Sequence, residues 1–219
     1  MKKILTTIFA LAMTASVSIA ADTAEYQASK RKDFSDKTII TPLPVYIIAT
    51  YDENGVPNAM NAAWGGQVSP KHIAFHLSPH KTTENLKLKK AFTVSYANKE
   101  NVVIADYFGV ETGHKLNKIE KVGMHAIKSK FVDAPIIDEF PLTIECKVVE
   151  MEMTPYNELR VVGEIVNLSA KESILDEKGN VDLGKLQPIM YDSSANLYRV
   201  IGEPVGKAFN DGLKIRDQK

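Results

Sequence analysis

Residues 44–66 read PVYIIATYDENGVPNAMNAAWGG, and this stretch decides the fold class. Pro44 to Tyr51 is rich in β-branched and aromatic residues, which favours a strand. The next four residues, Asp-Glu-Asn-Gly, are typical of a tight turn. Pro57 to Trp64 reads as a return strand, and Gly65 and Gly66 are expected to break it. The sequence therefore predicts a β-hairpin near the start of the domain.

Outward from this hairpin, short strands alternate with short helices. Lys81 to Lys90 has hydroxyl residues at its start and lysines at its end, a pattern typical of a helix. A second helix is expected over Glu100 to Phe108, and a helical turn at the end of Gly113 to Val122. Many strands joined by short helices predict a mainly β fold, a closed or partly closed antiparallel barrel in one domain. The remaining strands are expected over His72 to Ser78, Ala91 to Ala97, Met124 to Phe131, Leu142 to Met153, Leu159 to Ala170, Pro188 to Tyr191 and Asn196 to Ile201.

Composition limits the possible functions. The 219 residues are 44% hydrophobic and 25% charged, close to the average for globular domains. The 27 basic and 27 acidic residues cancel, so no long-range field would attract a nucleic acid. The single cysteine, Cys146, excludes an intramolecular disulfide, and its apolar strand predicts a buried, inert thiol. The common nucleotide-binding and hydrolase motifs do not occur.

The first twenty residues are typical of a secretory signal peptide. Lys2 and Lys3 precede a short apolar run, and Ser18 and Ala20 occupy the third and first places before a cleavage point. The apolar run is shorter than the roughly 20 residues needed to span a bilayer, so no membrane span is expected after cleavage. We therefore predict a signal peptide over 1–20, a polar leader over 21–41, a domain over 42–219, and a periplasmic or otherwise secreted location.

His72, His76 and His80 have a spacing of four, which would suit a metal ion on a helix. On a strand, neighbours at this spacing lie roughly 13 Å apart at about 3.3 Å per residue, too far to share one ion. Because the segment is predicted to be a strand, we expect no metal site. His76 is expected in the core or facing a pocket, and His80 at the end of the strand.

The segment Ser78 to Asn85 combines the predicted start of a helix with a cation and hydroxyl groups. The first amides of a helix have no intrahelical acceptor and lie at its positive end, so they attract phosphate. Lys81, Thr82, Thr83 and Asn85 could add charge-assisted and neutral hydrogen bonds. These residues fit a phosphate monoester site and an ordinary capped helix equally well.

A second cluster lies on the return strand of the hairpin. Asn58 and Asn61 supply donors and acceptors, while the small Ala62 and Ala63 would let a flat ligand approach the backbone. Trp64 could stack against such a ligand. The alternative is a strand whose small residues pack beneath a helix.

Six motifs, taken in order, resemble the flavin reductase-like family, most closely its flavoredoxin branch, from about Pro42 to Phe209. They are PLPVYIIATYDENGVPNAMNAAWGG, LSPHKTTENL, AFTVSYA, ADYFG, DEFPLTIECKV and GEPVGKAF. The resemblance implies an FMN-binding split barrel with Greek-key topology and a homodimer with one FMN per subunit. It also implies three groups of cofactor-binding residues. Along the isoalloxazine ring and ribityl chain would lie Asn58, Asn61, Ala62, Ala63 and Trp64, and the ribityl and phosphate end would be held by Ser78, His80, Lys81, Thr82, Thr83 and Asn85. The pocket would be closed by Ala105, Asp106 and Gly109.

The expected function is that of an exported FMN flavoprotein. Redox chemistry would belong to the flavin, so no side chain is named as a catalyst. NAD(P)H is scarce outside the cell, so we expect electron transfer with a protein or quinone-linked partner, or reduction of a small substrate. The alternatives are an NAD(P)H-dependent flavin reductase and a non-redox protein that binds another small ligand.

Overall fold

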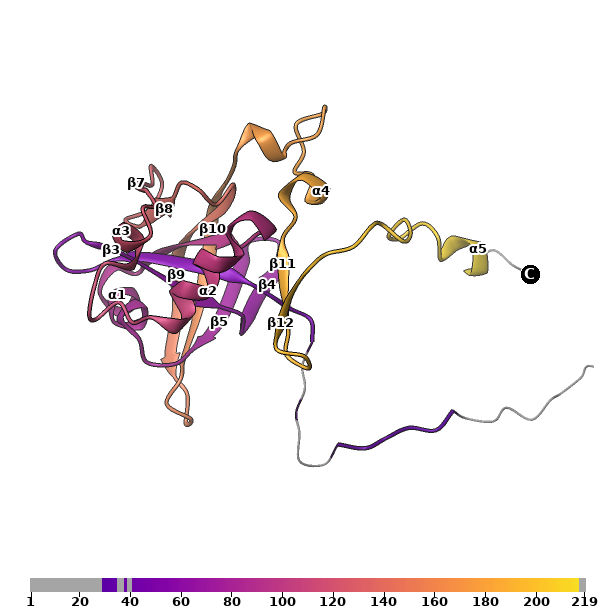
Figure 1. Cartoon of the computed structure of the whole chain (residues 1–219), viewed down its shortest axis with the longest axis horizontal. Helices are drawn as coiled ribbons and strands as arrows, with labels where there is room; N and C mark the ends of the chain where they lie inside the picture. Colours follow the sequence, from indigo (N-terminus) through magenta and orange to yellow (C-terminus); the bar gives the residue numbers. More distant parts are fainter. Residues whose placement is uncertain (1–28, 35–37, 39–40, 217–219) are drawn as a thin grey trace, which may run out of the picture. The chain divides into compact units, whose positions relative to one another are not determined.

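The computed structural model describes residues 29–34, 38 and 41–216. The chain divides into two compact units, Met1–Thr38 and Ile39–Lys219. In the first unit, the described residues form no helix or strand. The predicted signal peptide lies outside the described residues, as does most of the predicted leader. All the helices and strands described below belong to the second unit (Figure 1).

A seven-stranded sheet forms the body of this unit, and every neighbouring pair of strands is antiparallel. Its two edge strands, β3 and β4, are joined by only Ala63 and Trp64. Because two residues span only about 7 Å, the sheet must curl until its edges meet at this corner. This is the partly closed barrel that the sequence predicts. The strands lie in the order β3 (Pro57–Ala62), β2 (Tyr46–Tyr51), β6 (Ala91–Tyr96), β9 (Leu142–Met153), β10 (Leu159–Ala170), β5 (His72–Leu77) and β4 (Gly65–Ser69).

Aromatic rings fill the interior of the barrel. Phe75 packs edge-on against Tyr46, with ring centroids 5.5 Å apart, and against Phe92 at 6.5 Å. Leu86 of α1 (Lys81–Lys89) belongs to the same buried cluster, so this helix packs against the barrel core. Cys146 is buried there too, and burial, followed by the nearby Glu145, raises the pKa of its thiol to about 12. The thiol is therefore protonated and inert at neutral pH, as predicted.

A second core lies on the outer face of β2. Val45, Ile47 and Ala49 pack there with residues of α2 (Val102–Val110), including Ala105 and Phe108. Since Tyr46 and Ile48 face the barrel interior, β2 is buried on both faces. This explains the unbroken apolar run in the sequence. The packing also fixes α2 beside β3, where the candidate site lies.

Smaller elements surround the barrel. β1 (Leu43–Pro44), β11 (Ile189–Asp192) and β12 (Leu197–Val200) form a three-stranded sheet. β7 (Ala126–Lys128) pairs with β8 (Pro135–Ile137). The remaining helices are η1 (Lys99–Asn101), α3 (Lys118–Lys121), η2 (Glu172–Ile174), α4 (Leu183–Leu186) and α5 (Leu213–Arg216).

Two strand predictions were wrong. The predicted break at Gly65 and Gly66 is the start of β4, because β4 passes so close to β5 that only glycine fits: a Cβ at Gly65 would lie 2.3 Å from the Ala74 carbonyl oxygen. The strand predicted over Met124 to Phe131 is only Ala126–Lys128. The chain turns at Ser129, whose hydroxyl accepts hydrogen bonds from two following backbone amides.

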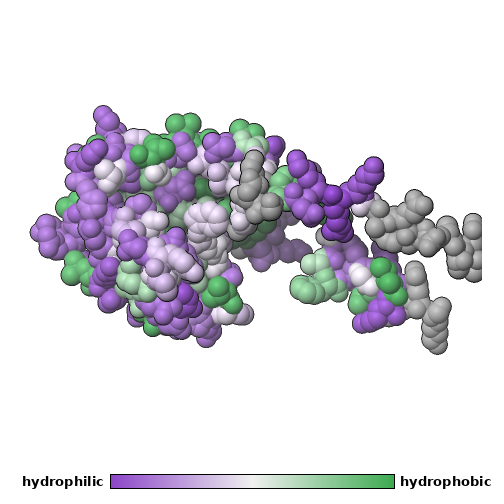
Figure 2. Space-filling view, turned by 90° about the horizontal axis from the view of Figure 1, so that it is seen from below, coloured by the Kyte–Doolittle hydropathy of each residue, from purple (hydrophilic) through white to green (hydrophobic). Residues whose placement is uncertain are grey.

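The surface of this unit is mainly polar on the face that Figure 2 presents. Figure 2 shows hydrophilic side chains over most of the face that it presents, with apolar ones in small separate patches. Across residues 29–34, 38 and 41–216, no helix has the length and apolar character to cross a bilayer. No group of three or more His, Cys, Asp or Glu in those ranges is placed to hold a metal ion.

Candidate functional site

A cavity of about 720 Å³ lies where the corner between β3 and β4 meets the end of β5, α2 and the β11–β12 hairpin. A volume of this size is typical of cofactor sites. Six separate segments of the chain therefore build one site. The lining residues are Val45, Met60, Asn61, Ala62, Ala63, Trp64, His76, Leu77, Ser78, His80, Asp106, Gly109, Val110, Glu158, Tyr191, Asn196 and Tyr198.

A smaller pocket of about 160 Å³ adjoins the first. The two share five lining residues: Met60, Asn61, His80, Gly109 and Val110. The smaller pocket also contains Lys81 and Thr82 from the start of α1 and Lys118 from the start of α3. A long ligand could therefore place one end in the large cavity and a small anionic end in the pocket.

The start of α1 explains why the pocket suits an anion. The helix begins at Lys81 after Pro79 and His80, and the Thr83 hydroxyl secures it by accepting from the His80 amide at 2.9 Å and donating to the His80 carbonyl at 2.7 Å. The backbone N–H groups of Lys81 and Thr82, the first two of the helix, have no intrahelical acceptor. They add positive potential to the pocket that these residues line.

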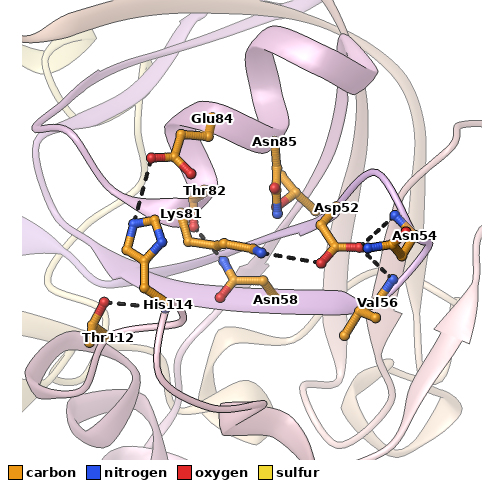
Figure 3. Close-up of polar contacts among 11 residues, drawn as sticks. Asp52, Asn54, Val56, Asn58, Lys81, Thr82, Glu84, Asn85, Thr112 and His114 are labelled. Carbon is orange, nitrogen blue, oxygen red and sulfur yellow. Dashed lines mark hydrogen bonds and ion pairs between the residues drawn. The ribbon is translucent and has the colours of Figure 1, made fainter.

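Lys81 is held by an ion pair with Asp52 in the turn of the β2–β3 hairpin (Figure 3). Its Nζ lies 3.2 Å from Asp52 Oδ2. Burial alone would raise the pKa of Asp52, but hydrogen bonds from the Val56 amide, Lys81 and the Asn54 amide outweigh this and lower it. The ionised Asp52 thus fixes the lysine and partly offsets its charge. The sequence predicted the turn but not this contact.

Lys118 is a second cation that sequence reasoning missed. It is only 4% exposed, and its Nζ donates to the carbonyls of Phe108 at 2.7 Å and Glu111 at 2.9 Å. Burial lowers its pKa to about 8, although Glu111 acts in the opposite direction. An ammonium group has three donors, so one remains for a ligand. Its place at the start of the short helix α3 gave no signal in the sequence, because α2 and the following turn supply its partners.

His80 lies between the two cavities. Burial, followed by the positive charges of Lys118 and His114, lowers the pKa of its imidazole below the usual 6.5. The ring is therefore neutral at pH 7, and one of its nitrogens can donate a hydrogen bond while the other accepts.

The β11–β12 hairpin closes the large cavity from the C-terminal end of the barrel domain. The Tyr198 hydroxyl donates to Asp106 Oδ1 on α2 at 2.7 Å. Burial, followed by this carboxylate, raises the pKa of Tyr198 to about 12. Tyr191 packs against Tyr198 with ring centroids 6.1 Å apart. Sequence reasoning missed the hairpin as a wall of the site, because only tertiary packing brings it to α2.

The sequence of this domain matches a known family. The model of the flavin reductase-like domain matches residues 39–195. The chain belongs to the flavin reductase-like family. Its fold is the flavin reductase-like split barrel.

Two solved structures support a flavoprotein of this family. Flavoredoxin of Desulfovibrio vulgaris (Miyazaki F) is 31% identical, with a TM-score of 0.79, over 84% of this chain and 100% of that one. Flavoredoxin from Methanosarcina acetivorans is 25% identical, with a TM-score of 0.78, over 85% and 100%. Among curated proteins, an uncharacterized protein of Aquifex aeolicus is 27% identical over 160 residues, covering 69% of this chain and 81% of that one.

Most of the residues expected to bind the cofactor line the two cavities of this flavin reductase-like domain. Three do not. Thr83 secures the start of α1, the Asn85 amide donates to the Thr50 hydroxyl at 3.0 Å, and buried Ala105 presents its carbonyl to Asn61 at 2.9 Å. The eleven that line one or both cavities are Asn58, Asn61, Ala62, Ala63, Trp64, Ser78, His80, Lys81, Thr82, Asp106 and Gly109.

Proposed function

We propose that this protein is an FMN flavoprotein of the flavoredoxin type, in which the large cavity takes the isoalloxazine ring and ribityl chain and the adjoining pocket takes the phosphate. The observation that carries this proposal is the adjacency of the two cavities, which share five lining residues and have Lys81, Lys118 and the first amides of α1 at the narrow end.

The narrow end suits a phosphate monoester in charge and donors. Such a group carries nearly two negative charges at neutral pH. Lys81 and Lys118 provide two cations, offset in part by Asp52. The Thr82 hydroxyl already accepts from the Asn58 amide at 2.7 Å, so its own proton is available for donation.

The wide end suits a flat ring with a hydrogen-bonding edge. Ala62 and Ala63 leave room beside the backbone, and Trp64 is 57% exposed on the wall of the cavity. The Asn61 amide is directed to the Ala105 carbonyl, which leaves its oxygen as an acceptor. When bound, FMN would supply the redox chemistry. The protein would bind and orient the ring and limit the access of water.

We further propose that the protein acts outside the cytoplasm as a homodimer and exchanges electrons with a redox partner or reduces a small substrate. The signal-like first twenty residues support export, and the 31% identity to a flavoredoxin supports an electron-transfer role.

The test begins with an absorption spectrum of the purified protein and continues with stopped-flow reduction of the bound flavin. We expect flavin bands in the visible range and slow bleaching by NADH and NADPH. Rapid bleaching by either nucleotide would instead assign the flavin reductase activity. A colourless protein with no affinity for flavin would overturn the proposal.

The phosphate assignment has its own test in the variant Lys81→Met. Loss of a charge-assisted contact should weaken FMN binding by about 1.5–3 kcal/mol. Because the variant leaves Asp52 without its cation, the double variant Asp52→Asn/Lys81→Met serves as a matched control. Riboflavin, which lacks the phosphate, should bind all three proteins with equal affinity. An equal loss for riboflavin would show that Lys81 shapes the site without contacting phosphate.

A further inference from the structure

A groove of about 650 Å³ lies at the other end of α1 from the phosphate pocket. It runs between the end of that helix, the loop after β7, and β9. Since α1 has nine residues, its two ends are about 13 Å apart at 1.5 Å per residue. The groove shares no lining residue with either flavin cavity. It is therefore a separate feature of the surface.

The groove is strongly basic. Five of its eleven lining residues are lysines, whereas Lys and Arg together make up only 27 of the 219 residues of the chain. Asp133 is its single acidic residue. The lysines are Lys89, Lys90, Lys128, Lys130 and Lys147.

Most of this charge is not neutralised. Lys89 Nζ lies 3.4 Å from Asp133 Oδ2. For the other four lysines, no ion pair occurs within the described part of the chain. The Lys90 ammonium reaches only the Met151 sulfur, at 3.8 Å. The groove thus keeps a net positive charge in a chain that is neutral as a whole.

The loop that carries Lys128 and Lys130 is held in place from beneath. Buried Glu145 accepts hydrogen bonds from the Ser129 hydroxyl and, at 2.6 Å, from the Asn167 amide. The Ser129 oxygen in turn accepts from the backbone amides of Phe131 at 2.9 Å and Val132 at 3.0 Å. These bonds fix the backbone between the two lysines, so both side chains start from set positions beside the groove.

Apolar side chains accompany the charge. Phe131 lines the groove and is 53% exposed, and Val148 lines it from β9. A hollow with cations around an aromatic residue fits a convex surface that offers carboxylates and an apolar side chain. A small anion would reach too few of the exposed lysines to bind well in water.

We propose that the groove docks an acidic segment of a partner protein, with carboxylates against the four unpaired lysines and one apolar side chain against Phe131. The charges steer the encounter, so association should be fast at low salt and slow as salt rises.

The test uses the full chain and a fluorescein-labelled synthetic peptide rich in glutamate with one central leucine, followed by fluorescence anisotropy. We expect salt-sensitive binding that falls at least about tenfold in Lys128→Glu/Lys130→Glu. Lys99→Glu/Lys178→Glu is the matched control, since it makes the same change in net charge at exposed residues outside the groove. An equal loss of peptide affinity in both variants would show that binding depends only on the overall charge of the protein, and it would overturn the proposal.

The apolar contact is tested by a double-mutant cycle between Phe131→Ser and replacement of the peptide leucine by glycine. Coupling between the two changes supports the proposal, and simple additivity contradicts it. Vesicles of phosphatidylcholine and phosphatidylserine, and inorganic tripolyphosphate, serve as rival probes. Groove-dependent binding of either one more tightly than the peptide would overturn the assignment of a protein partner. Circular dichroism of each variant checks that its fold is intact.

Discussion

At the scale of single residues, the candidate phosphate pocket depends on groups whose chemistry is set by burial. Lys118 is the clearest case, because burial lowers its pKa to about 8 and its carbonyl partners hold the ammonium in the pocket. A free lysine titrates near 10.4. The affinity of the pocket for an anion should therefore change with pH in a range where an exposed lysine would remain charged.

FMN binding should weaken as the pH rises above about 8. The charged form of Lys118 binds phosphate, and a bound phosphate raises its pKa, so the affinity should be level below that pH and fall by at most about tenfold per pH unit above it. Calorimetric titration with FMN from pH 7 to 10 measures this. Riboflavin should show no such fall over the same range, and Lys118→Gln should remove the pH dependence for FMN. A parallel fall for riboflavin would show that Lys118 acts on the fold instead.

The hydrogen bond between Tyr198 and Asp106 should contribute to stability as well as to the shape of the cavity. Tyr198→Phe should lower the free energy of unfolding by about 0.5–1.5 kcal/mol. Urea denaturation measures this change. In a double-mutant cycle, Asp106→Asn should cost little more once Tyr198 has been replaced. Full additivity of the two losses would contradict the contact.

At the scale of elements, the sequence predicts a helix or strand well when the residues that determine it lie within the element itself. The hairpin turn at Asp52, the helix from Lys81 to Lys89, and the strands Leu142–Met153 and Leu159–Ala170 agree with prediction within one or two residues. Their turn residues, end charges and apolar patterns lie within the element itself. The start of β4 was missed because Gly65 is required by the close approach of β5, a contact that the local sequence does not reveal.

The residues of the candidate site likewise fall into those that the local sequence predicts and those that only tertiary packing brings to the site. Lys81 was found because a helix start can be read from adjacent residues. Lys118, Tyr191 and Tyr198 were missed because they come from the short helix α3 and from a hairpin more than seventy residues farther along the chain. No local pattern marks such residues, because packing against α2 brings them to the site.

β10 offers a direct test of how closely the barrel interior is packed. The register between β10 and β9 shifts at Val162 and Gly163, and a Cβ at Gly163 would lie 2.5 Å from Phe92 Cζ and 3.0 Å from Cys146 Cβ. Gly163→Ala should therefore destabilise the protein by about 1–3 kcal/mol.

Chemical denaturation measures this loss, and two variants make the result specific. Gly202→Ala, where an added Cβ meets nothing within 4 Å, should stay within about 0.5 kcal/mol of the original protein. The double variant Gly163→Ala/Phe92→Leu should recover part of the loss. A Gly163→Ala protein as stable as the original would contradict the packing described here.

At the scale of the whole molecule, a split barrel holds two separate surfaces at opposite ends of one helix. The start of α1 helps to form the candidate phosphate pocket, and its end borders the basic groove. A protein with cofactor and partner sites that share no residue could keep its flavin in place while partners exchange. Separate variants at Lys81 and Lys128 should therefore change only one of the two binding activities each.

Export also belongs to this scale. We predict cleavage after Ala20 when the full chain is produced in a host with a periplasm, so that the mature protein begins at Ala21. Amino-terminal sequencing of the protein from the periplasmic fraction measures this. Replacement of the apolar residue Leu11 by arginine should retain the uncleaved chain in the cytoplasm. An uncleaved chain in the cytosol without that change would favour the NAD(P)H-dependent flavin reductase.

If the two adjoining cavities hold FMN with its phosphate at the start of α1, the phosphate must contribute to the affinity. Calorimetric titration of the flavin-free protein with FMN and with riboflavin at pH 7 tests it most directly. We expect FMN to bind at least about tenfold more tightly than riboflavin, since one charge-assisted phosphate contact is worth about 1.5–3 kcal/mol. Equal affinity for the two flavins, or no affinity for either, would contradict it.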